Sequence, residues 1–236
     1  MEYTGRSQVN LISESQEKQL GTEAYADILT KSPLSKRSDL QAQLQRVGQR
    51  IAAAADKPDF QWEFKVLEGT EINAFCLPGG KVAFWEGIMP IAQDDNGVAV
   101  IMGHEVAHAL ARHGAERMSQ SLGTQLLGQI LTAGVSMKNP AFAENFAQLY
   151  GLGTSLAVTL PWGRAQESEA DHIGLILMAK AGYDPAAAVG FWERMSKVQQ
   201  GGKPPQFLST HPSDETRINQ IKQWLPEAQK YYKVQK

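Results

Sequence analysis

Cysteine is almost absent from this chain, because Cys76 is the only one among 236 residues. A single cysteine excludes an internal disulfide and every zinc site built from paired cysteines, including the site of cytidine deaminases. Net charge is equally scarce, since 23 Lys and Arg against 25 Asp and Glu leave −2. Without a basic surface to displace counterions, no nucleic-acid partner is expected. Charge alone also gives the chain no attraction for a membrane surface.

Long purely apolar runs are missing as well. Residues 118–137 and 145–163 carry no charge, but the first stretch contains many Ser, Thr and Gln residues. That polarity is too high for contact with lipid, so we expect no transmembrane segment and interpret residues 118–163 as an uncharged helical lid region. The N-terminus shows no basic and apolar signal sequence either. The chain is therefore expected to be cytosolic, or to have lost its signal.

The composition suits a single domain spanning residues 1–236, since 42% hydrophobic residues are ample for one core. In residues 13–57, apolar side chains spaced by three and four predict two amphipathic helices, broken near Ser32-Pro33. We interpret them as a packing layer, with a partner surface as the alternative. The last part, 164–236, predicts further helices, of which the first runs from Arg164 to Lys180 and is stopped by Gly182.

Residues 58–117 show a different pattern. Aromatic and apolar residues alternate between 60 and 66, and the turn Pro78-Gly79-Gly80 separates two further apolar runs. These features predict a small antiparallel sheet. Asp94 and Asp95 then supply a cap and first-turn acidity for a helix from about 95 to 117. The expected fold class is α+β and mainly helical, with the sheet beside that helix.

The pentapeptide HEVAH, His104 to His108, lies within this helix. It fits HExxH, in which two histidines one turn apart face the same way and can bind one Zn²⁺. Glu105 is then placed to reach the water that the metal binds. The alternative is a pair of histidines on a helix surface, because HExxH also occurs in proteins that bind no metal. A third ligand decides between the two.

Metzincins take their third ligand from HExxHxxGxxH, but Ala111 and Gly114 occupy the required positions here. His113 would lie about 140° around a continuous helix from His108, too far to share its metal. That class is excluded.

Gluzincins instead use a Glu from a second helix, and Glu167-Ser168-Glu169-Ala170-Asp171 begins a suitable one. Glu167 and Asp171 share a helix face, so Glu167 can bind zinc while Asp171 accepts the N–H of a ligating histidine. Glu169 points roughly the opposite way and is expected to be a solvated acid.

Three ligands, His104, His108 and Glu167, leave the fourth zinc position for water, which is the arrangement of a catalytic metal. The sequence therefore predicts one Zn²⁺ per chain. Glu105 is the predicted catalytic residue: it takes the proton of the zinc-bound water, which attacks a peptide carbonyl, and then protonates the leaving amine.

An extended substrate needs a backbone edge beside such a site. The strand around Asn73, Ala74 and Phe75 is predicted to bind substrate by strand addition, which would place the scissile carbonyl over the metal. The alternative is that Asn73 and the glycines after it only make turns. Both interpretations stay open on the sequence.

Four motifs in order, NAFCLPGG, HEVAH, ESEAD and HPSDETR, resemble the zinc metallopeptidases of the CAAX-prenyl-protease and HtpX type. The resemblance runs from about residue 15 to 225 and is greatest to the soluble, BepA- and LoiP-like bacterial branch. It implies a gluzincin core, with Glu167 as the third zinc ligand and Asp171 behind it. The family's His-Pro motif, with an Arg six positions later, matches His211 and Arg217.

His211 and Arg217 are accordingly predicted to be catalytic, by stabilising the oxyanion with about 3 kcal/mol. His211 could instead occupy the fourth zinc position in a resting state, or belong to a helix-capping turn. No catalytic role is expected for Cys76.

By resemblance, the protein is expected in the periplasm, with possible peripheral association with the outer membrane, where it degrades unfolded or misfolded envelope polypeptides. The cytoplasm stays open as an alternative. A rival function of another class is a chaperone-like, zinc-containing binding module whose site is closed and latent.

Overall fold

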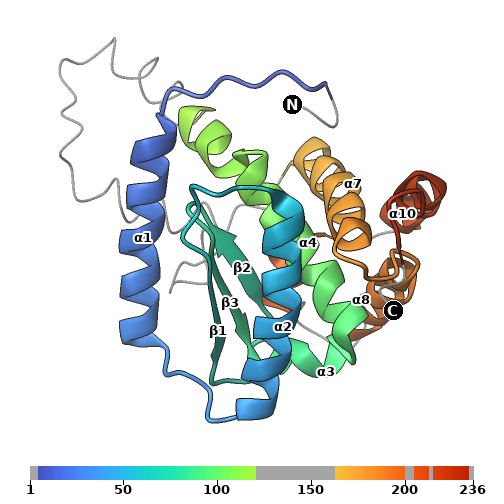
Figure 1. Ribbon diagram of the computed structural model, residues 1–236, viewed down its shortest axis with the longest axis horizontal. Helices are drawn as coiled ribbons and strands as arrows, with labels where there is room; N and C mark the ends of the chain where they lie inside the picture. The colour runs from blue at the N-terminus through green and yellow to red at the C-terminus, as the bar shows by residue number, and fades with distance from the viewer. Residues whose placement is uncertain (1–4, 121–162, 200–204, 213–214, 234–236) are drawn as a thin grey trace.

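The computed structural model describes residues 5–120, 163–199, 205–212 and 215–233. It confirms the expected fold class, because helices surround one three-stranded sheet (Figure 1). The expected lid region, residues 118–163, lies outside the described residues, apart from its first three positions and its last. None of the helices within those described ranges is long and apolar enough to cross a bilayer.

The sheet contains β1 (Glu63–Leu67), β2 (Ala74–Leu77) and β3 (Lys81–Trp85), in the order β1-β3-β2. β2 and β3 form the expected antiparallel hairpin, and Gly79 and Gly80 make its turn with φ of 88° and 85°, a region that favours glycine. The expectation of a wholly antiparallel sheet is wrong for β1, which pairs with β3 in parallel. The reason is strand order: β3 lies between its neighbours, so the chain runs along β1, back along β2 and forward again along β3.

Helices cover both faces of the sheet. α2 (Ser38–Ala55) and α4 (Asp95–Leu110) share a core with one face, while α1 (Glu14–Lys31) packs on the other (Figure 1). The two N-terminal helices are thus present, but they lie on opposite faces and do not form one layer. α1 begins with a capping box between Ser13 and Gln16, which satisfies N–H groups of its first turn. The strand side chains facing α2 and α4 are Phe64, Val66, Ala74, Cys76, Val82 and Phe84.

α4 is the central helix and carries HEVAH. A short helical link, η1 (Glu86–Ile88) and α3 (Met89–Ala92), leads into it, and the side chain of Asp94 caps it by accepting a hydrogen bond from the Gly97 amide at 2.9 Å. The expected helix end near 117 is wrong, because α4 ends at Leu110. Arg112 has the left-handed φ of 53°, and residues 113–120 form a separate helical stretch.

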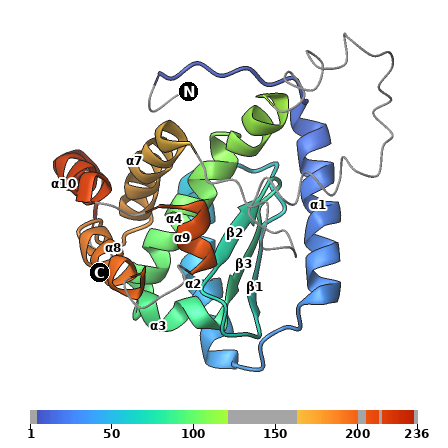
Figure 2. The same ribbon diagram turned by 180° about the vertical axis from the view of Figure 1, so that it is seen from behind.

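α7 (Arg164–Lys180) crosses α4 at close range, and its bounds are those expected from the sequence. A Cβ on Gly103 would lie 2.8 Å from the carbonyl oxygen of Gly174, so two glycines allow the helix backbones to touch. This approach brings the first turn of α7 to the HEVAH side chains. α10 (Glu215–Ala228) packs against α7, and α8 (Ala187–Gln199) packs against α4 and α10. α9 (Gln206–Thr210) lies beside α4 and β2 (Figure 2).

Candidate metal centre

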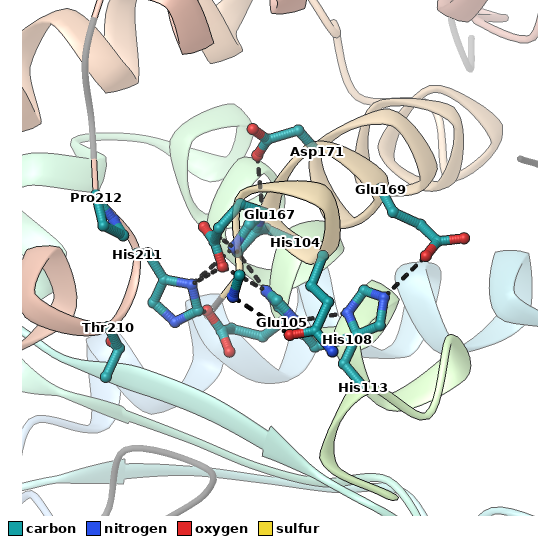
Figure 3. A network of polar contacts seen from close by, with 12 residues as sticks. His104, Glu105, His108, His113, Glu167, Glu169, Asp171, Thr210, His211 and Pro212 are labelled. Carbon is teal, nitrogen blue, oxygen red and sulfur yellow. Dashed lines mark hydrogen bonds and ion pairs between the residues drawn. The ribbon is translucent and has the colours of Figure 1, made fainter. Parts of the chain in front are cut away.

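Four buried side chains converge between α4, α7 and the end of α9. One ligand atom from each of His104, His108, Glu167 and His211 lies within 4.8 Å of the others (Figure 3). The two HEVAH histidines are only 2% and 1% exposed, which excludes the alternative of a histidine pair on a helix surface. The structure thus brings together the three ligands expected from the sequence and adds His211 to them.

The distances describe a compact set of donors. The Nε2 atom of His108 lies 3.1 Å from Nε2 of His104 and 3.2 Å from Oε1 of Glu167. The Nδ1 atom of His211 lies 3.0 Å from each of those two partners. Imidazole nitrogens with one carboxylate oxygen are the ligands that zinc binds in catalytic sites. The donor set therefore fits Zn²⁺.

Two buried carboxylate oxygens give independent support for a cation. Within the described ranges, Oε1 of Glu105 and Oε2 of Glu167 accept no hydrogen bond although water cannot reach them. Glu167 Oε2 does form an ion pair with Nη1 of Arg217, at 2.9 Å. Oε1 of Glu105 lies 3.5 Å from Nε2 of His211. A buried carboxylate oxygen without a hydrogen bond is costly, so a cation between these side chains fits the site.

Burial and neighbouring charges set the protonation states that metal binding needs. Burial lowers the pKa of His104 and of His108, which favours neutral imidazoles. Burial alone would raise the pKa of Glu167, but the charges of His211 and Arg217 outweigh it and hold that pKa well below its usual value. The ligands are therefore in their metal-binding forms near neutral pH.

Glu105 differs from its neighbour Glu167 in its electrostatics. Burial raises the pKa of Glu105 to about 7, against the opposing effect of His211. A carboxyl group with a pKa near the working pH can accept a proton and return it. This property distinguishes Glu105 from the ligands.

Asp171 lies behind His104. Its Oδ1 is 2.9 Å from Nδ1 of His104, the position expected of a group that orients a ligating imidazole. Arg217 donates to both oxygens of Asp171 at 2.7 Å and to the Pro212 carbonyl at 3.0 Å, and it stacks 3.5 Å from the ring centroid of Trp192. The guanidinium therefore ties α7 to the segment that carries His211.

Glu169 and His113 were missed by the sequence interpretation. Glu169 is not a solvated acid, because it is 4% exposed and its Oε2 lies 3.1 Å from Nε2 of His113. Nδ1 of His113 lies 2.8 Å from Nδ1 of His108, on the side away from the metal centre (Figure 3). The only available signal was the short distance along the chain between the two histidines. That spacing indicates a contact between the two rings only if the helix is known to break at Arg112.

The expected substrate strand lies at an edge of the sheet, because β2 pairs with β3 alone among the described strands. Its residues Asn73, Ala74 and Phe75 are buried to between 1% and 3% exposure. The Phe75 ring contacts Tyr25 of α1, with ring centroids 6.3 Å apart, and so lies on the sheet face opposite α4. Any contact of this segment with a polypeptide would thus have to come from backbone atoms.

Comparisons with known proteins agree with this geometry. Residues 38–225 match the family described as Peptidase family M48. The "Mitochondrial metalloendopeptidase OMA1" of Schizosaccharomyces pombe is 37% identical over 230 residues, which cover 96% of this chain and 66% of that protein. Its namesake from Saccharomyces cerevisiae is 32% identical, over 96% of this chain and 69% of that protein.

A bacterial relative is also similar. The "Beta-barrel assembly-enhancing protease" of Escherichia coli is 27% identical over 219 residues, which cover 91% of this chain and 45% of that protein. The chain thus spans from under half to about two thirds of the length of these relatives. The names of the yeast relatives give a mitochondrial location, so they do not support the expected periplasmic one.

Proposed function

We propose that this protein, which belongs to peptidase family M48 and is a zinc metalloendopeptidase, cleaves internal peptide bonds of extended or misfolded polypeptides. The observation that carries the proposal is the buried donor set of His104, His108 and Glu167 with Glu105 beside it. We propose those three residues as the zinc ligands, one ion per chain, and residues 1–236 as one metallopeptidase domain.

Each residue has a distinct part in the proposed mechanism. Bound Zn²⁺ would polarise the scissile carbonyl and make the attacking water more acidic. Glu105 accepts the proton from that water and returns it to the leaving amine, a role supported by its pKa of about 7. Asp171 accepts the Nδ1 hydrogen of His104, which leaves Nε2 of that ring as the donor atom for the metal.

His211 acts as a gate in this proposal. Its Nδ1 lies as close to His104 and Glu167 as the proposed ligand atom of His108 does, so it sits where the attacking water would have to enter. This position favours the resting-state interpretation over direct stabilisation of the oxyanion. If His211 closes the site, His211→Ala raises peptidase activity, whereas a fall by orders of magnitude would establish the oxyanion role instead.

Arg217 serves in positioning. Its guanidinium already donates to Asp171 and Pro212 and pairs with Glu167, which ties its N–H groups to protein partners. These contacts favour a role in which Arg217 holds Glu167, Asp171 and the His211 segment in their relative positions. They favour this role more than the expected contact with the oxyanion. A direct catalytic role of Arg217 remains a prediction.

The proposed substrate is an extended segment of an unfolded chain. The support is β2, an edge strand among those described that packs against the HEVAH helix, so added backbone at Asn73, Ala74 and Phe75 would run past the metal centre. We propose a place in the soluble, BepA- and LoiP-like branch of CAAX-prenyl-protease and HtpX-type peptidases, a role in envelope protein quality control, and a periplasmic location with possible peripheral membrane contact. Fractionation of the source cells tests the compartment.

Glu105→Gln tests the mechanism. This substitution keeps the shape of the side chain and removes the base, so casein cleavage should fall by about 10²–10⁴-fold while zinc stays at one ion per chain. The release of fluorescent peptides from labelled casein measures cleavage, and elemental analysis measures the zinc content. The matched control is Glu193→Gln on an exposed position of α8, which should change neither. Full activity of Glu105→Gln would refute the role of Glu105.

The same pair of measurements separates the rival function. A chaperone-like module would retain zinc and slow the aggregation of an unfolded protein. In that case the wild type would not cleave casein, and Glu105→Gln would behave like the wild type. Cleavage by the wild type that a chelator stops, and that added zinc restores, excludes this rival.

A further inference from the structure

We propose that His113 and Glu169 are positioning residues, which fix the ring orientation and tautomer of His108 so that its Nε2 faces the metal. The inference rests on the zinc site proposed above and adds two residues to it. We call the series Glu169, His113 and His108 the relayed support. Asp171 with His104 is called the direct support.

The hydrogen positions follow from the outer end of the relayed support inwards. Oε2 of Glu169 lies 2.5 Å from Nε of Arg6 and 3.1 Å from Nε2 of His113. A carboxylate beside a guanidinium is an acceptor only, so the hydrogen of this second contact belongs to His113 Nε2. We take His113 as a neutral imidazole, which carries one hydrogen, so that Nδ1 of His113 is an acceptor.

The next contact transmits this assignment to the proposed ligand. Nδ1 of His113 lies 2.8 Å from Nδ1 of His108, so the hydrogen between them sits on His108. Nε2 of His108 then has a lone pair, and this atom faces His104 and Glu167 at 3.1 and 3.2 Å. A hydrogen on Nδ1 of His113 would force the opposite tautomer, with N–H aimed at the metal centre. The carboxylate thus determines which nitrogen of His108 can bind.

The break after α4 makes this contact possible. On a continuous helix, His113 would lie about 140° around the axis from His108. Arg112 instead has a φ of 53°, and the chain turns so that the two rings meet with centroids 4.9 Å apart. The Arg112 side chain holds the turn by donating to Glu17 and to the Ile12 carbonyl, each at 2.7 Å. A left-handed non-glycine residue costs on the order of 1–3 kcal/mol, which is typical of positions kept for a functional reason.

Burial strengthens the hydrogen bonds of the relayed support. His113 is fully buried and Glu169 is 4% exposed, so water does not compete with these contacts. Arg6 closes the outer end, since its Nη1 and Nη2 also pair with Glu116 at 2.6 and 2.8 Å. Residues 5–12 thereby run across the helical stretch of residues 113–120 to α7 (Figure 1). Arg6 lies outside residues 38–225, the part matched by the family.

Zinc affinity of His113→Leu tests the proposal. Leu removes the acceptor for His108, and we expect the zinc dissociation constant, measured by competition with a chromophoric chelator, to rise about 10–100-fold. His113→Gln can accept from His108 with its amide oxygen and donate to Glu169 with its NH₂, so it should restore much of the affinity. A purely structural role for His113 would not give this rescue.

The matched control is a second His–Glu pair on α7. His172 Nε2 lies 2.8 Å from Glu227 of α10, and this pair is on the outer side of the helix. His172→Leu removes a comparable contact and should leave zinc affinity unchanged. A loss in His172→Leu equal to that in His113→Leu would overturn the proposal, as would wild-type affinity in His113→Leu.

A measurement on the unaltered protein covers the case in which His113→Leu does not fold. In the zinc-loaded wild type, ¹⁵N NMR of the imidazole rings should find hydrogens on Nδ1 of His108 and on Nε2 of His113. The reverse assignment overturns the relayed support even while zinc binding and cleavage persist. Failure of the wild type to bind zinc would instead refute the proposed function, so the two failures are distinguishable.

Discussion

The two histidines of HEVAH are supported from behind in different ways. His104 reaches a carboxylate directly, because Asp171 lies 2.9 Å from its Nδ1. His108 reaches one through an intervening ring, since His113 stands between it and Glu169. Both carboxylates come from the same turns of α7, two residues apart. One short segment of sequence thus orients both proposed ligands, by one hydrogen bond in the first case and by two in series in the second.

The difference lies in what each support depends on. The direct support needs only two helices in contact, which the close approach of Gly103 to Gly174 provides. It is reinforced by Arg217, which joins Asp171 to the segment carrying His211. The relayed support depends on the break at Arg112 and on the anchoring of residues 5–12 through Arg6. Binding at His108 is therefore coupled to the N-terminal segment, and binding at His104 to the C-terminal helices.

The largest expected effect is that of Asp171→Ala on the direct support. It removes the acceptor of His104 and leaves the buried Arg217 without its two-pronged partner. We expect zinc affinity to fall about 10–100-fold, and the free energy of unfolding to fall by about 3 kcal/mol, because the buried guanidinium loses one of its two carboxylate partners and keeps only Glu167. Chelator competition and urea unfolding of the metal-free protein measure the two changes.

His113→Leu provides the contrast, since it replaces a buried ring with an apolar side chain and leaves the partners of Arg217 in place. It should match Asp171→Ala in zinc affinity but lose much less stability. Equal losses of stability in the two variants would contradict the distinction between the supports, because they would show that Arg217 does not depend on Asp171.

The direct support could be predicted from the sequence and the relayed one could not. Glu167 and Asp171 are four residues apart on a regular helix, so the helical repeat alone gives them one face. Glu169 was interpreted as solvated because it points away from that face. The interpretation failed because a second buried partner, His113, lies on that other side. Nothing in the local sequence marks the non-glycine residue Arg112 as left-handed.

The fold shows the same limit. The hairpin at Gly79-Gly80 and the bounds of α7 follow from local turn chemistry and apolar spacing, and both were predicted. The parallel pairing of β1 with β3 and the placement of α1 and α2 on opposite faces are choices of tertiary packing. Local periodicity predicts that a helix or strand forms, but it does not predict which other element that helix or strand packs against.

Arg112→Ala compared with Arg112→Gly isolates the break that the relayed support requires. Both variants lose the contacts to Glu17 and Ile12, but only alanine keeps a Cβ in the left-handed conformation. We expect the alanine variant to be less stable than the glycine variant by about 1 kcal/mol in urea unfolding. An alanine variant as stable as the glycine one would mean that the turn has given up its left-handed residue.

A smaller effect on stability, one that depends on pH, is expected at Glu116, which pairs with Arg6 at the outer end of the relayed support. Burial raises the pKa of Glu116, but its hydrogen bonds with Arg6 and Gln166 outweigh burial and lower the pKa below its usual 4.5. Its stabilisation is therefore fully present above about 4.5 and is lost as pH falls through the lower folded-state pKa. Glu116→Gln should lower the urea midpoint near neutral pH, and this difference should shrink in acid. A difference independent of pH would show that the carboxylate charge does not matter.

Cys76 offers a control for both supports, and no labelling of this residue is expected in the folded wild type. Burial, with the charge of Glu105, raises the pKa of this thiol well above its usual value, and the residue is 1% exposed. A thiol reagent should therefore label Cys76 only when the fold opens. Labelling should be faster in Asp171→Ala, by about tenfold for each 1.4 kcal/mol of lost stability, and nearly unchanged in His113→Leu. Because Cys76 lies on β2 and faces α4, rapid labelling of the folded wild type would show instead that the proposed substrate strand separates from the HEVAH helix without global unfolding.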